Sequence, residues 1–552
     1  MSVSLVPCCS DCGADVRPPA EEVCALPLQP LSDDEEGSPA SPVLTSKSRL
    51  EALTNVFPEE SLVRSITLRK SLQQFGILWR MPMAHMSQTM ANFYDWSEPA
   101  QGYDYFLAHA WRTSGWLKYF SLLFYSSHNF LLILMFVVAF IMYAICMLDL
   151  LPTLGYIRLV ALDWTCPENE PHPGCPLGPW LLVGGFLAVV AGLLIAPYLP
   201  SFCTSSDLCF VDAACIHQAD PEKKQEDQSL RTVPEGIGQC AVNTTAYTQS
   251  GRVQAEYWHF AALFDDCMLM MIWWLWCVFE IAAYRKVNPR GALVLAPMFV
   301  ERTVLLVVFG AFTMAGFFWI IDANNYDPRV KAIFVAFNPL ILLVHFLRSN
   351  ARDKTTLLQD LERFDLENVH CSLDSDREFV MAAIDRWYGS RKAFTEYVRG
   401  PLRQELLNSA TRFSTTYIFW MTAPAIVAAL EDHLALWKAR VPVRAAAAHF
   451  VAVVLGDYAL WMSLCMRMLI ALCFYFDAKC RWKIVDYLMT VLIHVIFCGS
   501  AFVGELIGTE ASRRGLWTAC AFMVFAGALL LGMMKASFPD FRWLECSSCC
   551  NS

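Results

Sequence analysis

The chain has 552 residues, of which 56% are apolar and only 17% are charged. Soluble globular proteins usually have about a quarter of their residues charged, so this composition excludes an ordinary soluble protein and favours one that faces lipid. The net charge of −10, with no extended basic stretch in the sequence, argues against a nucleic acid as partner.

The chain opens with a segment that offers little to bury. Residues 1–60 are acidic and rich in Ser and Pro around LSDDEEGSPASPVLTS, which predicts a disordered N-terminal tail. No basic region followed by an apolar run stands at the start, so no cleavable signal peptide is expected. Residues 61–128 are mixed and aromatic, which predicts a folded cytosolic segment.

Separated apolar runs follow, each near the ~20 residues that cross a hydrocarbon core. The three clearest carry no charge: 130–148, 180–199 and 303–321. Weaker runs are 332–347, 415–430, 447–476, 485–507 and 516–534. The sequence therefore predicts a polytopic α-helical membrane protein with about eight transmembrane helices. They comprise a hairpin at 129–200, a pair at 301–348 and C-terminal helices at 413–535.

Flanking charge predicts the orientation of these helices. Basic residues that fall on one side of the eight-helix arrangement are Lys118, Arg285, Lys286, Arg290, Arg302, Arg348, Arg352 and Lys354. The positive-inside rule makes that side cytosolic and places both termini there. Lys438, Arg440 and Arg444 fall on the opposite side, so the C-terminal half follows the rule less well. Nothing in the sequence indicates which membrane holds the protein.

Two groups of cysteines stand in polar segments. Cys166 and Cys175, in the Pro-rich loop 149–179, either form a disulfide on an oxidising side or remain thiols. Cys546, Cys549 and Cys550 lie in a Cys-rich tail, 536–552, and are either S-acylated or unmodified. A further group near the start of the chain comprises Cys8, Cys9, Cys12 and Cys24. Neither this group nor the C-terminal one has the four-ligand spacing of a zinc site, so no metal site is predicted.

Residues 349–412 form a polar block with helical periodicity. Leu357, Leu358 and Leu361 recur at helical spacing, and Ser375 to Glu378 has the spacing of a capping box. Gly389 can end that helix in a left-handed conformation. We expect a cytosolic amphipathic helical module that packs on a partner surface.

Three short apolar segments on the expected cytosolic side are typical of strands. One is FLAHAW (106–111), the second is FVDAACIHQ (210–218), and the third runs from Met268 to Leu275 before WCVFEI. Helical stretches follow the first and third, an order typical of parallel α/β folds. Such folds place polar site residues where strands end, here His109 and Asp212.

These three segments resemble strands and the WCxxE box of the Toll/interleukin-1 receptor (TIR) domain, as in TIR-like multi-pass membrane proteins of protists. The resemblance implies a TIR-like α/β domain split between 61–128 and 201–300, since a two-helix hairpin returns the chain to the same side. It also implies that Glu280, beside Trp276 and Cys277, cleaves NAD at the nicotinamide–ribose bond. A carboxylate there can stabilise an oxocarbenium-like centre. NAD is the implied substrate, and other TIR-like domains or a second copy are the implied partners beside the lipid bilayer.

Two departures leave alternatives open. MLMMIWW runs straight into the WCxxE box where the family has a Ser- and Tyr-containing loop, and 235–262 looks like a polar insertion. The segment 267–284 is also interpretable as a membrane helix with Glu280 as its one charge. A signalling or interaction protein is therefore the first hypothesis, ahead of an NAD hydrolase and of a transporter or channel with a regulatory cytosolic domain.

Polar residues within the predicted spans bear on the transporter hypothesis. Asp457, Arg467, His494 and Glu505 occupy positions where transporters handle ions or protons. Hydrogen bonds between helices explain such residues equally simply, and we favour that interpretation. No internal repeat or matched pair of broken helices is visible among the runs.

Overall fold

The computed structural model describes residues 64–80, 93–100, 104–109, 114–157, 175–200, 207–215, 259–264, 292–323, 340–369, 374–410, 415–477 and 482–535. All of them belong to one compact unit, Ser46–Ser552. The predicted tail at 1–60 and the Cys-rich tail at 536–552 lie outside the described residues.

Six of the described helical segments are long and apolar enough to cross a membrane. They are α5 (Gly115–Met147), α6 (Trp180–Ile195) with η3 (Ala196–Tyr198), α12 (Met298–Ala323), the continuous α19 (Val443–His449), η6 (Phe450–Trp461) and α20 (Met462–Tyr475), α21 (Lys483–Arg514) and α22 (Leu516–Lys535). Large apolar side chains are exposed along their outer faces, such as Ile133, Leu488 and Val495. Such surfaces suit lipid rather than water, so the fold agrees with an integral, polytopic helical membrane protein.

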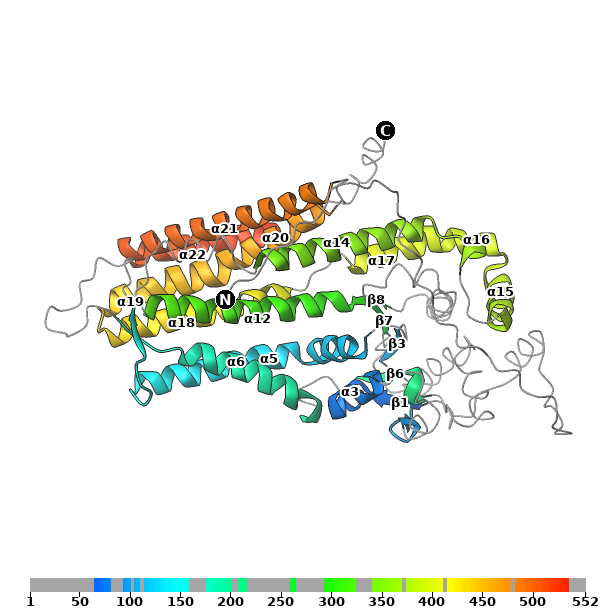
Figure 1. Ribbon diagram of the computed structural model, residues 1–552, viewed down its shortest axis with the longest axis horizontal. Coiled ribbons are helices and arrows are strands. Elements are labelled where there is room, and N and C mark those ends of the chain that lie inside the picture. The colour runs from blue at the N-terminus through cyan, green and yellow to red at the C-terminus, as the bar shows by residue number, and fades with distance from the viewer. Residues whose placement is uncertain are drawn as a thin grey trace, which may run out of the picture. The chain divides into compact units, whose positions relative to one another are not determined.

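Two further helices lie in the same bundle: α14 (Leu340–Glu362) and α18 (Thr415–Lys438) (Figure 1). Helix α18 contacts α5, α6, α12 and α20, and therefore needs no continuous apolar face toward lipid. This explains why it tolerates Glu431 and His433 where the sequence predicts an ordinary span at 415–430. The predicted span at 332–347 begins outside the described residues and ends in α14.

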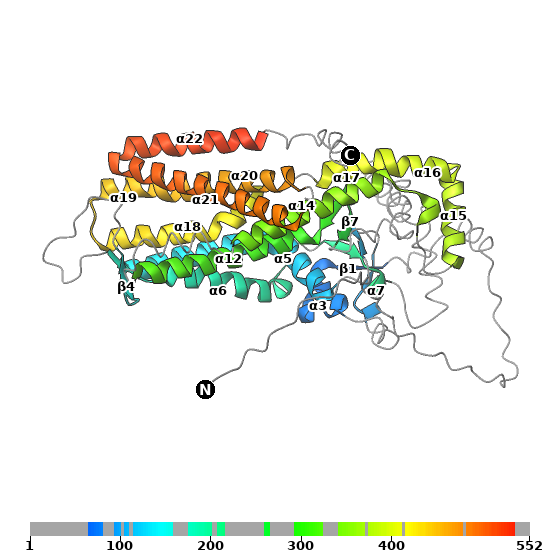
Figure 2. The same ribbon diagram turned by 45° about the horizontal axis from the view of Figure 1, so that its top comes forward.

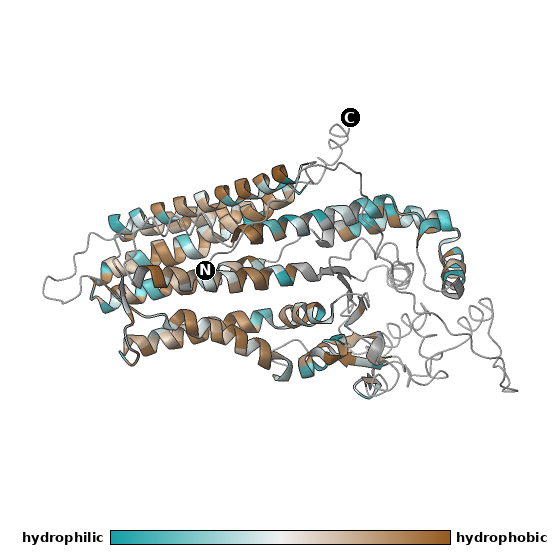
Figure 3. Cartoon of the chain, viewed as in Figure 1, coloured by the Kyte–Doolittle hydropathy of each residue, from teal (hydrophilic) through white to brown (hydrophobic). Residues whose placement is uncertain are grey.

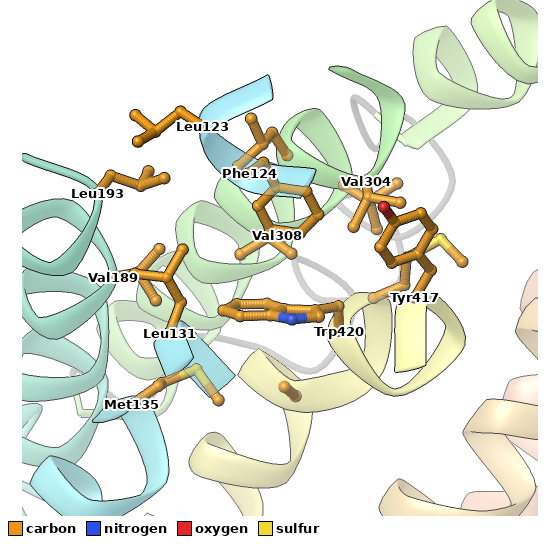
Figure 4. Close-up of a cluster of buried hydrophobic side chains, with 14 of the residues drawn as sticks. Leu123, Phe124, Leu131, Met135, Val189, Leu193, Val304, Val308, Tyr417 and Trp420 are labelled. Atoms are coloured by element: carbon orange, nitrogen blue, oxygen red, sulfur yellow. The ribbon is translucent and has the colours of Figure 1, made fainter. Parts of the chain in front are cut away.

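The bundle core is centred on an aromatic residue of α18. Trp420 is fully buried, and its indole N–H donates to the carbonyl of His128 in α5 at 3.0 Å. Figure 4 shows Trp420 among side chains from α5, α6 and α12, including Phe124, Val189 and Val308. A residue of this size makes α18 the helix around which the others pack.

A six-stranded sheet accompanies the bundle, in the order β2-β1-β6-β3-β7-β8 (Figure 2). Its strands are β1 (Arg64–Thr67), β2 (Glu98–Pro99), β3 (Tyr105–His109), β6 (Leu208–Phe210), β7 (His259–Phe264) and β8 (Ala292–Pro297). The pairs β6–β3, β3–β7 and β7–β8 are parallel, whereas β1 is antiparallel to β2 and β6. In chain order the four parallel strands are arranged 2-1-3-4, as in doubly wound folds.

The α5–α6 hairpin leaves this sheet and returns to it. Helix α5 follows β3, and the chain re-enters the sheet after α6 as β6. Short helices after β1, namely α2 (Leu68–Ser71) and α3 (Gln73–Arg80), hold the end of α6. The Arg69 guanidinium donates to the carbonyl of Leu199, and the Gln73 amide donates to that of Pro197. Segments 104–109 and 207–210 therefore lie side by side despite the intervening hairpin.

The third parallel strand differs from the sequence expectation. The predicted strand Met268–Leu275 lies outside the described residues. The observed strand, β7, begins at His259, within the stretch 235–262 that resembles a polar insertion. The apolar run HFAALF indicates this strand in the sequence. The run that follows it is more apolar, and the strand was therefore predicted there.

The block 349–412 is helical where the structure describes it. It contains the end of α14, η4 (Leu366–Asn368), α15 (Asp374–Tyr388), α16 (Arg391–Tyr397), η5 (Val398–Leu402) and α17 (Arg403–Ala410). Phe364, Ile384 and Phe394 are buried among these helices, whose remaining surface is largely hydrophilic (Figure 3). Gly389 follows α15 with φ +78°, and α17 contacts β8.

Different strands lie at the two ends of the bundle. At the sheet end, β3 and β8 precede α5 and α12. At the hairpin end, β4 (Gly155–Ile157) pairs with β5 (Cys175–Leu177) beside the end of α18. At this hairpin end Lys438 pairs with Asp149 at 3.0 Å, so this exception to the positive-inside rule has an acidic partner.

Candidate functional site

The edge at which the parallel strands end is one candidate site. We call it the carboxyl edge. His109 ends β3 and pairs in register with Leu263 of β7. Strand β6 ends earlier, at Phe210, which pairs with Phe106, so β3 and β7 extend beyond β6. Doubly wound folds bind ligands outside this edge, where the strand order reverses.

Asp212 lies close to the same edge. It begins the short helix α7 (Asp212–Cys215) directly after β6. At the opposite edge, the Asp104 carboxylate accepts a hydrogen bond from the backbone N–H of Leu208 at 2.7 Å, which fixes the β3–β6 register. His109 and Asp212, identified from the sequence as strand-end residues, thus lie at the carboxyl ends of two neighbouring strands, His109 as the last residue of β3 and Asp212 just after β6.

The thiols near Asp212 have a packing role. Cys209 and Cys215 are buried, and the backbone N–H of Val211 donates to the Cys215 sulfur at 3.4 Å. Burial, reinforced by Asp207, raises the pKa of the Cys209 thiol well above its usual range. A thiol held protonated is a poor nucleophile, so Cys209 does not contribute covalent chemistry to this edge.

Several predicted site residues are not located by the structure. Glu280, Trp276 and Cys277 lie outside the described residues, as do Cys546, Cys549 and Cys550. Cys175 is buried in β5, but Cys166 lies outside the described part, so their disulfide stays a prediction. Among the described residues no group of three or more His, Cys, Asp or Glu side chains could hold a metal ion.

An arginine network at the sheet end joins α14 to the α20–α21 connection. Arg348 is fully buried; it donates to the carbonyl of Phe476 at 2.9 and 3.0 Å and to Thr490 and Asp486 of α21. Arg352 donates to Asp477 and Asp486. Burial raises the pKa of the Asp477 carboxyl, although Thr355 and Arg352 act against this shift. In the sequence both arginines fit the role of flanking charges, and no local pattern indicates this structural role.

A second polar group lies at the hairpin end and was also missed. The Glu431 carboxylate of α18 accepts from the backbone N–H groups of Leu181 and Leu182 at 3.2 and 3.4 Å. These belong to the first turn of α6, whose preceding residue, Pro179, supplies no side-chain cap. Glu431 therefore acts as the cap of a neighbouring helix.

Two histidines stack close to this cap. His433 of α18 lies parallel to His449 of α19, with ring centroids 5.8 Å apart, and also stacks on Tyr143 of α5. Both histidines are buried, and the Nδ1 atom of each has no hydrogen-bond partner among the described residues. The sequence does not predict that these histidines stack, because they are 16 positions apart and lie in different helices.

The four polar residues noted in the predicted spans have different surroundings. Arg467 donates to the carbonyl of Met533 at 2.8 Å, and His494 contacts the Cys498 thiol at 3.5 Å. The Arg467 hydrogen bond joins α20 to α22 and fits the interpretation of hydrogen bonding between helices, whereas the His494 contact lies within α21. Asp457 is buried in η6, and Glu505 interacts electrostatically with it from α21.

Comparison with family models, with curated proteins and with solved structures finds no significant match to this chain. The assignment of function therefore rests on the residues and their geometry.

Proposed function

We propose that this chain is a membrane-anchored signalling protein whose split TIR-like domain, on the cytosolic side, binds a partner or NAD. The observation that carries the proposal is the pairing of β3 with β6 in a parallel 2-1-3-4 sheet. The TIR resemblance requires this pairing, since the membrane hairpin α5–α6 separates β3 from β6 in the chain.

Direct connections between sheet and bundle favour signalling. Strand β8 ends at Pro297 and α12 begins at Met298, while β3 is followed by α5. The carboxyl edge is therefore also the edge from which the chain enters the bundle. A ligand or partner bound there would act directly on α12 and, through a short connection, on α5, which is the coupling a membrane receptor needs.

The proposal includes eight crossings, with both termini cytosolic. We count the more polar α14 and α18 as crossings beside the six apolar helices, which makes eight passes. An even number returns the C-terminus to the side of the N-terminus, the side that the positive-inside rule makes cytosolic.

Glu280 remains the candidate catalyst for NAD cleavage. Strands β7 and β8 are neighbours and parallel, so the segment 265–291 starts and ends at the same sheet. One complete membrane crossing would leave these strands on opposite sides of the bilayer. This supports the soluble interpretation of 267–284 over the membrane helix.

Cleavage of NAD by the purified full-length protein tests the enzymatic part. We expect slow release of nicotinamide, abolished by Glu280→Gln with unchanged expression and thermal stability. Glu98→Gln is the matched control, because it removes an exposed carboxylate of β2, at the far end of the sheet order from β7 and β8, and should retain turnover. Turnover that survives Glu280→Gln would exclude this residue as catalyst; absence of turnover in the wild type would leave a binding role alone.

A transporter or channel is the second candidate. Glu431, His433, His449 and Asp457 are buried between helices, where polar side chains are costly unless they serve packing or transport. Ion flux through proteoliposomes that contain the full-length protein, set against protein-free vesicles, distinguishes this function from signalling.

A further inference from the structure

Asp457 is a buried carboxyl group that lacks a hydrogen-bond donor. The residue is 2% exposed, and its Oδ1 atom has no hydrogen-bond partner within the part of the chain that the structure describes. It lies in η6, twelve residues of π-helix in the middle of a membrane-crossing segment. Such widened turns occur frequently at functional sites.

Glycines of α21 bring backbone directly against this carboxyl. A Cβ atom at Gly504 would lie 2.6 Å from Asp457 Oδ1, and one at Gly508 would lie 3.3 Å from Asp457 Cβ. The neighbouring indole, Trp461, donates its N–H to the carbonyl of Ser500 at 2.9 Å. The N–H of this indole is thus engaged with a backbone carbonyl and not with Asp457.

The titratable groups around Asp457 do not neutralise a negative charge. Glu505 of α21 is exposed and acts on Asp457 electrostatically, and Cys465 of α20 also interacts with it. His449 of α19 lies eight residues earlier, stacked on His433 of α18. Helix α22 contributes Phe522, packed on Gly456. No lysine or arginine of the described residues is among the charges that act on Asp457.

An ionised carboxylate is strongly disfavoured in such surroundings, because it loses hydration and gains neither a counter-ion nor a donor. A second carboxylate nearby adds repulsion. We propose that Asp457 is an intramembrane proton-binding site that holds its proton at neutral pH. This inference does not depend on the sheet or on NAD.

A lipid-soluble carbodiimide tests the proposal on the full-length protein in lipid nanodiscs. A protonated carboxylic acid adds across the C=N bond of the reagent and rearranges to a stable N-acylurea, so all atoms are retained and no co-reactant is needed. We expect mass spectrometry to find Asp457 modified at neutral pH, with labelling that declines as the pH rises. Asp486, paired with Arg348 and Arg352, should stay unlabelled and is the matched control.

Two variants separate a proton site from a merely structural carboxyl. Glu505→Gln removes the repelling charge, so the midpoint of labelling should move to lower pH by about one unit. Asp457→Asn mimics the protonated acid and should lose the infrared band of a buried carboxylic acid without lowering the thermal stability. If this variant fails to fold, Asp457→Glu serves instead and should retain both labelling and band.

Three outcomes would overturn the proposal. The first is no modification and no carboxylic-acid band at any pH in the wild type. The second is modification of Glu505 alone. The third is protection of Asp457 by Na⁺ but not by K⁺ at constant pH, which would make the bound cation sodium rather than a proton.

Discussion

Arg348 shows how one buried charge is stabilised between helices. Its side-chain hydrogen bonds go to the α20–α21 connection and to the first turns of α21, and its side chain is 1% exposed. A guanidinium suits this position because it is planar, always charged and able to donate to several acceptors at once. Removal of such a partner leaves another charge buried and unpaired.

We therefore expect Arg348→Met to destabilise the protein by about 3 kcal/mol, since the buried carbonyl of Phe476 loses its donor and Asp486 keeps only Arg352 as its partner. Thermal unfolding in detergent measures the loss. Arg391→Met is the matched control, because Arg391 is half exposed in its ion pairs with Asp385 and Glu367 and should cost under about 1 kcal/mol. Equal losses in both variants would contradict a structural role for the Arg348 network.

The sequence identified most of these polar residues but not their partners. Asp457, Arg467 and Glu505 were visible because charge is rare in apolar runs. The function of Arg348 was not visible, since a basic residue at a span boundary equally fits a flanking charge. Its partners lie more than 120 residues away, and no local pattern encodes that distance.

Helix α6 illustrates the same limit at the scale of an element. Its apolar run, WLLVGGFLAVVAGLL, predicted the span closely, and Pro179 precedes its start. The cap that satisfies its first turn comes from Glu431 of α18, some 250 positions away. Propensity and hydropathy locate a helix, whereas tertiary packing supplies the groups that complete its ends.

Loss of this cap should weaken the hairpin end. We expect Glu431→Leu to cost about 1–3 kcal/mol, because two buried backbone N–H groups lose their acceptor. Glu431→Gln keeps an acceptor oxygen and should recover most of that loss. Thermal unfolding and protease sensitivity of the loop 149–179 measure both. An unchanged Glu431→Leu variant would mean that water or another group satisfies these donors.

Strands were harder to predict than helices. FLAHAW contains all of β3 except Tyr105, and FVDAACIHQ contains the end of β6, because short apolar runs before polar residues are distinctive. Strands β1, β2 and β8 were not predicted, and β7 was assigned to an insertion. Each is six residues or shorter, and such segments acquire their structure from neighbours across the sheet.

At the scale of the whole molecule, strand pairing constrains the membrane topology. Helix α5 has 33 residues, about 50 Å at 1.5 Å per residue, and exceeds a hydrocarbon core of ~30 Å. Its first turns therefore extend out of the bilayer, where α5 packs on α3. Because β6 and β7 belong to one sheet, the segment between them starts and ends on the side of that sheet.

N-glycosylation provides a test of sidedness with single acceptor sites. The native sequon at Asn243 lies between β6 and β7 and should stay unmodified in eukaryotic cells, because the sheet is expected to be cytosolic. Asp163→Asn creates an acceptor in the loop 149–179, with Trp164 and Thr165 completing the sequon, and should be glycosylated. A mobility shift reversed by endoglycosidase measures both sites in the same membranes.

Asn243→Gln is the control, which should change nothing in the native chain and leave the Asp163→Asn shift intact. A shift in the native chain that Asn243→Gln removes would place the sheet on the lumenal side, where NAD-dependent cytosolic signalling could not take place.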